Sequence, residues 1–332
     1  MSSETIKTGV KPSAQGLLLN LVLAVIAVLI GAGVGEGILR LKNSSMKNYD
    51  IEMWRYAKEL KFRSPDPVLD HEHVPNASAI LQSVTIRTND WGLRGGTVPP
   101  RHAGQRRILF LGGSITLGWG VAEDQTMTAL LQSNFDRDHI DAVVMNAGIG
   151  NYDTQRYVEL FLRRLSDLRP TDIVVHYFLR DAEMLEPGRG NWLLQHSQLA
   201  VTMWEVWNRL VSKTGEKSIT DHYQAVYNPH YPGLAVMKAD LAKLADYAKQ
   251  HDVRIYLTMV PDVHNLASYE LSFAHQIVEQ VAKQLGYKYL DLLAAFGHLS
   301  PEQVCAMPGD PHPNALGHKV MADVIYPLLQ LR

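Results

Sequence analysis

Apolar and polar positions form blocks along the chain, and these blocks predict regular elements. Helical periodicity and short apolar runs alternate over most of its length. Five runs are typical of buried strands: RRILFLG (106–112), DAVVMNAG (141–148), TDIVVHYF (171–178), VRIYLTMVP (253–261) and YKYLDLL (287–293). Helical periods cover 123–136, 152–167, 234–250, 266–285 and 314–330. This alternation predicts a three-layer α/β/α fold, a central parallel sheet of about five strands with helices on both faces.

A different pattern occupies the N-terminal region. The segment 16–40 carries a charge-free apolar run from Leu17 to Val34, which is long enough to cross a bilayer. We predict a retained transmembrane anchor at 16–40 after a short tail (1–15); a cleaved signal peptide and a buried helix are the alternatives. Basic residues lie on both sides of the run and do not decide its orientation. Because the tail is very short, we expect a cytoplasmic N-terminus and a periplasmic or extracytoplasmic main domain.

The chain after the anchor divides into a linker and a main domain. Residues 41–104 are polar and proline-dotted, and SVTIRTNDWGLRG (83–95) predicts a strand or hairpin there. The main domain spans 105–332 and contains an insertion at about 184–233. Within the insertion, the tryptophan-bearing stretch 190–213 has a helical period. It is interpreted as a helix on the edge of the core, a cap over the site, or a contact with the membrane surface.

The anchor itself is rich in glycine. Gly31, Gly33, Gly35 and Gly37 give two overlapping GxxxG spacings. Such spacings let a second helix approach closely, so the anchor would suit a membrane-protein partner. Small residues in a membrane helix without a partner are the simpler interpretation.

Composition excludes several classes of function. The net charge of −2 argues against a nucleic-acid partner. Cys305 is the lone cysteine, which rules out an internal disulfide framework and a CxxC metal site. His71 and His73 form an HEH pair without a third ligand in view, so we expect no metal there. Neither a metal nor an organic cofactor is expected.

Two loops carry residues suited to nucleophilic catalysis. FLGGSITLGWG (110–120) places Ser114 in a small-residue turn between a strand and a helix. PGDPHPNALGH (308–318) offers a base, His312, with the carboxylate of Asp310 two residues before it. A serine becomes a nucleophile when a base is in reach, and a carboxylate can orient that base.

Together these blocks resemble the SGNH, or GDSL-like, hydrolase superfamily over about residues 85–332. In that family a strand ends in a GDS-type turn that bears the nucleophile, and a C-terminal Asp/His pair completes a triad. Here the turn reads GGS, with Gly113 in the aspartate position. The resemblance implies a flavodoxin-like SGNH hydrolase fold and a triad of Ser114, His312 and Asp310.

Two middle blocks imply an oxyanion site by the same resemblance. VMNAGIGNYDTQ (144–155) is similar to the second family block, whose glycine N–H binds the oxyanion; that position falls on Asn151, with Gly150 just before it. In the third block, HYFLRDAE (176–183), Arg180 stands where the family has an asparagine donor. Arg180 either donates to the oxyanion or forms a structural ion pair with a neighbouring carboxylate.

Other polar residues near the predicted sheet edge have simpler interpretations. We expect His318 to cap or pack the last helix and His176 to be a satisfied core residue. Asp262 and His264 either line the substrate site or merely end their strand.

The resemblance implies a serine esterase that hydrolyses small acyl esters through an acyl-enzyme on Ser114. With an anchor, we expect the substrate to be an acylated glycan, bearing O-acetyl groups on a cell-envelope or extracellular polysaccharide. One alternative is a polysaccharide O-acetyltransferase that uses the same triad together with a membrane acyltransferase. Another is a catalytically inactive glycan-binding or assembly subunit.

Overall fold

The chain divides into two compact units in its computed structural model. The first unit holds residues 1–51 and 190–214, and the second holds residues 52–189 and 215–332. The structure describes residues 14–185, 191–211, 218–307 and 312–330.

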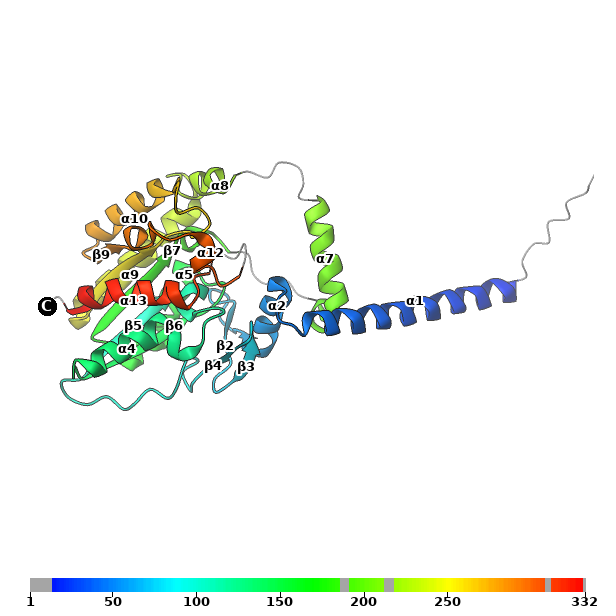
Figure 1. Cartoon of the computed structure of the whole chain (residues 1–332), viewed down its shortest axis with the longest axis horizontal. Helices are drawn as coiled ribbons and strands as arrows, with labels where there is room; N and C mark the ends of the chain where they lie inside the picture. The colour runs from blue at the N-terminus through cyan, green and yellow to red at the C-terminus, as the bar shows by residue number, and fades with distance from the viewer. Residues whose placement is uncertain (1–13, 186–190, 212–217, 308–311, 331–332) are drawn as a thin grey trace, which may run out of the picture. The chain divides into compact units, whose positions relative to one another are not determined.

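The second unit is built on a five-stranded parallel sheet (Figure 1). Its strands are β5 (Arg106–Gly112), β6 (Ala142–Gly148), β7 (Asp172–Phe178), β8 (Arg254–Val260) and β9 (Lys288–Asp291). They lie in the order β6-β5-β7-β8-β9, and each neighbouring pair is parallel. This is the flavodoxin-like order, in which β6 lies on one side of β5 and the later strands β7, β8 and β9 lie on the other. Ligands of such sheets bind beyond the carboxyl ends of the strands at that switch point.

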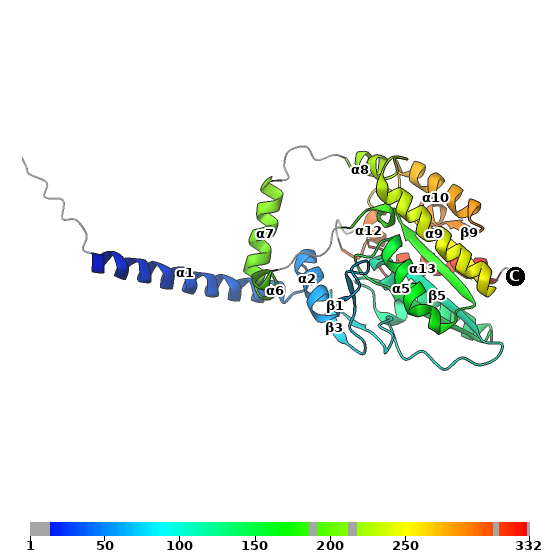
Figure 2. The ribbon, with the colours of Figure 1, turned by 180° about the vertical axis from the view of Figure 1, so that it is seen from behind.

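Helices cover both faces of the sheet. α4 (Met127–Arg137) and α13 (Ala315–Gln330) share a core with Ile108 and Phe110 of β5 on the face seen in Figure 1. α5 (Thr154–Arg163), α9 (Pro232–His251) and α10 (Ser272–Gln284) share a core with Leu109 and Leu111 on the other face (Figure 2). Successive side chains of a strand point to opposite faces, so β5 reads as one continuous apolar run because both faces are covered. The predicted three-layer fold is confirmed.

Short elements connect these layers. Two predicted helices are broken: 123–136 begins as a 3-10 turn before α4, and 152–167 ends as one after α5. The first break has a clear cause, because the Thr126 hydroxyl accepts the N–H of Ala129 and starts a new helix at Met127. The remaining short elements are α3 (Ser114–Leu117), η1 (Glu123–Gln125), η2 (Leu165–Leu168), η3 (Leu179–Ala182), α8 (Ile219–Val226), α11 (Leu293–Phe296) and α12 (Pro301–Val304).

The segment expected to be a linker is largely folded. α2 (Tyr49–Glu59) is followed by two antiparallel pairs. In the first pair, β1 (Lys61–Arg63) lies beside β2 (His71–His73). In the second pair, β3 (Ser78–Leu81) turns into β4 (Val84–Arg87), so the hairpin starts earlier than the stretch 83–95 suggested.

The first unit contains a long apolar helix and two shorter ones. α1 (Ala14–Asn43) is long and apolar enough to cross a membrane, and its most apolar 18-residue stretch contains no buried residue. α6 (Trp192–His196) and α7 (Gln198–Val211) belong to the same unit. The insertion is therefore divided, since α8 belongs to the unit that contains the sheet.

Candidate active site

Ser114 stands at the start of α3, directly after the turn that ends β5. Gly112 closes the strand where a side chain would not fit: a Cβ there would overlap Thr116 Oγ1 and lie 2.7 Å from the carbonyl oxygen of His176. α3 ends after one turn because Gly118 adopts a left-handed φ of 79°. The serine is thereby held at the carboxyl end of β5.

The imidazole of His312 meets the hydroxyl of Ser114. Nε2 of His312 lies 2.6 Å from Oγ of Ser114, although the two residues are 198 positions apart in sequence. His312 is buried, and its carbonyl oxygen accepts the N–H of Ala306 at 2.8 Å. The predicted acid, Asp310, lies outside the described residues. A serine in hydrogen-bond contact with an imidazole is the arrangement that activates a nucleophile.

A small pocket of about 30 Å³ lies beside Ser114. Its walls come from the segments that follow β5 and β6, and from the end of β7 with the turn after it. Three of the predicted site residues, Ser114, Asn151 and Arg180, therefore share one cavity. The full lining is Gly113, Ser114, Ile115, Asn151, Tyr152, His176, Phe178, Arg180 and Asp181.

The loop after β6 treats the two predicted oxyanion residues differently. Asn151 lines the pocket and has a left-handed φ of 63°, a conformation that asparagine tolerates better than most residues. The N–H of Gly150, in contrast, donates to the Tyr56 hydroxyl at 2.9 Å. The expectation that Gly150 donates to the oxyanion is therefore corrected: its N–H is engaged by the Tyr56 side chain.

Tyr56 belongs to a buried polar cluster that sequence reasoning missed. Its hydroxyl lies 2.5 Å from Nε2 of His73, and Nδ1 of His73 lies 2.8 Å from the carbonyl oxygen of Gly92. Burial lowers the pKa of His73 to about 3, so the ring is neutral. A neutral ring that donates from Nδ1 must accept at Nε2, so Tyr56 donates to His73 while it accepts from Gly150.

A lysine supports the same loop from its other side. Nζ of Lys61 donates to the carbonyl oxygen of Gly150 at 2.6 Å and to Nε2 of His71 at 3.1 Å. Burial, reinforced by the charges of Arg156 and Arg180, lowers the pKa of Lys61 to about 7. The HEH pair of the sequence thus serves this support: burial lowers the pKa of His71 to about 4, and His71 accepts from the lysine.

Arg180 forms an ion pair and also borders the cavity beside Ser114. It follows β7 on η3 and lines the pocket with Ser114. Its Nε lies 3.3 Å from a carboxylate oxygen of Glu183, and its Nη2 donates to the Asn151 side chain at 3.1 Å. The guanidinium is therefore an ion-pair partner that also borders the cavity.

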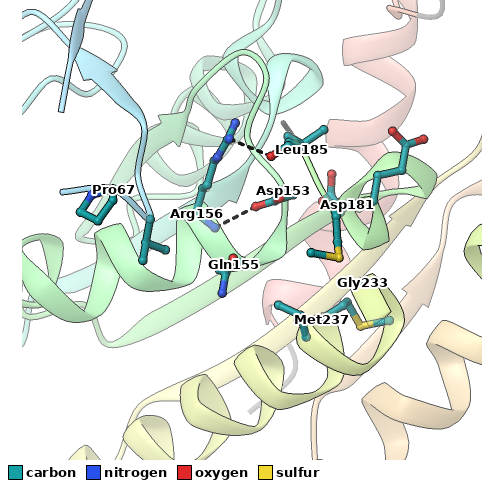
Figure 3. Close-up of a pocket in the computed structure, with 12 residues that line it drawn as sticks. Pro67, Asp153, Gln155, Arg156, Asp181, Leu185, Gly233 and Met237 are labelled. Atoms are coloured by element: carbon teal, nitrogen blue, oxygen red, sulfur yellow. Dashed lines mark hydrogen bonds between the residues drawn. The ribbon is translucent and has the colours of Figure 1, made fainter. Parts of the chain in front are cut away.

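A larger pocket of about 260 Å³ shares Asp181 with the pocket of Ser114 (Figure 3). In it the backbone N–H of Arg156 donates to Asp153 at 2.9 Å, and its guanidinium donates to the carbonyl oxygen of Leu185 at 3.3 Å. Burial raises the pKa of Asp153, and it raises the pKa of Asp181 well above the usual range. The two pockets therefore share a buried carboxyl, Asp181, whose neutral form is favoured by burial.

The other histidines of the sheet edge bind partners within the fold. Nδ1 of His318 accepts the N–H of Met127 at the start of α4. His176 is buried against Thr258, with 2.7 Å between Nδ1 and Oγ1. Its Nε2 has no hydrogen-bond partner among the described residues and the residue lines the Ser114 pocket, so the expectation of a satisfied core histidine is corrected. Asp262 accepts the Nδ1 proton of His264 at 2.8 Å, so these two residues bind each other. Within the described ranges, no group of three or more His, Cys, Asp or Glu side chains could hold a metal ion.

Solved structures of esterases are similar to this chain, whereas no family model and no curated protein matches it. The esterase EstA from Pseudoalteromonas sp. is 14% identical over 68% of this chain and 97% of its own, with a TM-score of 0.44. Axe2, an acetylxylan esterase from Geobacillus stearothermophilus, is 16% identical over 68% of this chain and 95% of its own, with a TM-score of 0.44. TesA is 15% identical over 68% of this chain and 98% of its own, with a TM-score of 0.46. Two of these three solved structures, EstA and Axe2, are named as esterases.

Proposed function

We propose that this chain is a membrane-anchored serine esterase of the SGNH type that removes small acyl groups. The observation that carries the proposal is the 2.6 Å contact between Nε2 of His312 and Oγ of Ser114 at the switch point of the sheet. Packing alone does not require this contact, which joins a histidine to the serine of a strand-end turn 198 residues away.

The mechanism follows from this contact. Ser114 Oγ attacks the ester carbonyl while His312 takes its proton, and His312 then returns the proton to the leaving alkoxide. The resulting acyl-enzyme is hydrolysed by water that His312 deprotonates in turn. Asp310 orients His312 in this proposal, as the family resemblance implies.

Oxyanion donors surround the same cavity in the proposal. The backbone N–H groups of Ser114 and Asn151 are two of them, and the guanidinium of Arg180 is the third. A cation beside the developing negative charge stabilises the transition state more than the ground state. This arrangement replaces the asparagine donor of the family pattern with a charged one.

The size of the cavity supports a short acyl group. A volume of about 30 Å³ exceeds the roughly 10–15 Å³ that a cavity needs to hold one water molecule. A methyl group of an acetyl ester therefore fits, and we propose that the cavity favours it over a long acyl chain. With α1 as a membrane anchor, O-acetyl groups on a cell-envelope or extracellular glycan are the proposed substrate, and the sheet-bearing unit is proposed to be extracytoplasmic.

Active-site labelling tests the proposal directly. The purified full-length protein in detergent should react with a fluorophosphonate probe and hydrolyse p-nitrophenyl acetate faster than p-nitrophenyl octanoate. Ser114→Ala should abolish labelling, and His312→Ala should lower turnover at least about 10³-fold. Ser133→Ala is the matched control, because this exposed serine bonds only to its own helix in the described structure. Equal labelling of wild type and Ser114→Ala, or no labelling of either, contradicts the proposal.

A further inference from the structure

α7 carries an apolar face that the proposed ester chemistry does not use. At about 100° per residue, its exposed apolar side chains fall within one arc about 160° wide. Glu205 and Asn208 fall outside this arc. The arc contains Met203, Trp204, Val206, Trp207, Leu210 and Val211, each between 50% and 66% exposed.

A carboxylate of α1 holds the beginning of α7. Glu36 accepts the N–H of Gln198 at 3.1 Å, the N–H of Leu199 at 2.8 Å and the hydroxyl proton of Ser197 at 2.9 Å. The Ser197 hydroxyl in turn accepts the N–H of Ala200 at 3.0 Å. Three of the four N–H groups that a helix start leaves unpaired are thus satisfied, and a negative charge lies at the positive end of the helix dipole. The start of α7 is therefore fixed to one position on α1.

That position is the end of the apolar run. The charge-free stretch Leu17–Val34 stops immediately before Gly35 and Glu36. At Gly35 the helices touch closely: the Leu199 side chain lies 3.6 Å from where a Cβ would be. Eighteen helical residues span about 27 Å, which is close to the roughly 30 Å of a hydrocarbon core. A span of α1 across a bilayer would therefore hold α7 at the level of the bilayer surface.

The direction of α7 fits that level. It runs across the end of α1 rather than alongside it (Figures 1 and 2). Tryptophan is enriched at membrane–water interfaces, and helices with one broad apolar face lie in the plane of that interface.

We propose that α7 lies in the membrane–water interface, with its apolar face, including Trp204 and Trp207, in lipid. The proposal rests on the proposed membrane span of α1 and is independent of the chemistry at Ser114. It assigns the tryptophan-bearing part of the insertion to a lipid surface, as a second membrane attachment beside α1.

Site-specific fluorescence on the full chain tests this inference. In a Cys305→Ser background, Trp207→Cys and Asn208→Cys place an NBD label at two positions about 100° apart on the same helix turn, the first inside the apolar arc and the second outside it. Each protein is reconstituted into vesicles of phosphatidylcholine and phosphatidylglycerol (3:1). The label at position 207 should emit at shorter wavelength and be quenched by lipids with a nitroxide near the headgroup, whereas the label at position 208 should show neither effect. Glu36→Gln should weaken the contrast by loosening the start of α7.

Vesicle flotation and ester turnover show which of three proposals fails: the membrane span of α1, the interfacial position of α7, or the esterase activity. If the protein floats with the vesicles but positions 207 and 208 behave alike, α7 is not interfacial and the inference is overturned while the α1 anchor stands. If position 207 is shielded without lipid quenching, a second copy or another protein covers the face, which also overturns it. If the protein does not float, the span of α1 fails and the inference fails with it. Turnover of p-nitrophenyl acetate, measured in parallel, reports on the proposed esterase alone.

Discussion

Replacing Tyr56 by phenylalanine tests how the loop that carries Asn151 is held. In the wild type the Tyr56 hydroxyl accepts the N–H of Gly150 and donates to Nε2 of His73, and both Tyr56 and His73 are fully buried. Phenylalanine keeps the ring but leaves both of these buried groups without their partner. Each unsatisfied buried group costs about 1–3 kcal/mol, so the free energy of unfolding should fall by about 2–6 kcal/mol. Turnover should fall too, because the loop beside Ser114 loses a support.

Urea unfolding and esterase turnover of the full-length protein measure these two effects. Trp119 is a local reporter, since its ring centre lies 5.4 Å from that of Tyr56. Tyr287→Phe is the matched control: its buried hydroxyl donates to the carbonyl oxygen of Leu241 at 2.7 Å, and neither residue lines the Ser114 pocket. The control should lose about 1–3 kcal/mol and keep its turnover. A Tyr56→Phe protein within about 0.5 kcal/mol of wild type, or one with unchanged turnover, refutes the reasoning.

Two further predictions concern charges around the pocket. The pKa of Lys61, lowered to about 7, lies below that of lysine in the unfolded chain, about 10.4. Between pH 7 and 10 the unfolded chain therefore binds more protons, and the free energy of unfolding should rise with pH. Lys61→Met should flatten this rise in urea unfolding at pH 7, 8 and 9, and parallel slopes would contradict the prediction. Arg180→Met should lower kcat/KM about 10²–10³-fold, with less than about 1 kcal/mol lost in stability, because its ion pair is exposed. Glu183→Gln removes that ion pair and the charge that Glu183 presents to His222, but it leaves the guanidinium of Arg180 in place, so turnover should stay near wild type. Equal losses in the two variants would reduce Arg180 to an ion-pair partner.

The fold could be predicted because its strands are buried on both faces. A run such as 106–112 cannot be an exposed helix, and its alternation with helical periods leaves few other arrangements. The ends of the helices were harder to predict from the sequence, since a single capping residue such as Thr126 decides where α4 begins. The prediction placed the hairpin β3–β4 too late in the sequence for a similar reason. Its turn is made by Gln82 and Ser83, both with positive φ, and neither residue type is typical of such a turn.

The candidate site likewise contains residues that the sequence could predict and residues that it could not. Ser114 and His312 could be named from the sequence because each stands in a short loop with chemistry-bearing neighbours beside a regular element. Tyr56 and Lys61 could not, because their contacts with Gly150 cross about ninety positions and follow no periodic pattern. Gly150 was misjudged for that reason, since a sequence shows that an N–H exists but not which side chain takes it.

The 198 positions between Ser114 and His312, the proposed nucleophile and base, decide when the proposed site can form. His312 is followed after one residue by Asn314, whose side chain accepts the first N–H groups of α13. The base is therefore in place only once α13 has docked on the sheet. A chain that is still being synthesised would therefore have no esterase activity until α13 has packed. Esters near the membrane would not be cleaved by a partly folded protein. During refolding, the time at which ester hydrolysis begins would thus report when α13 packs on the sheet.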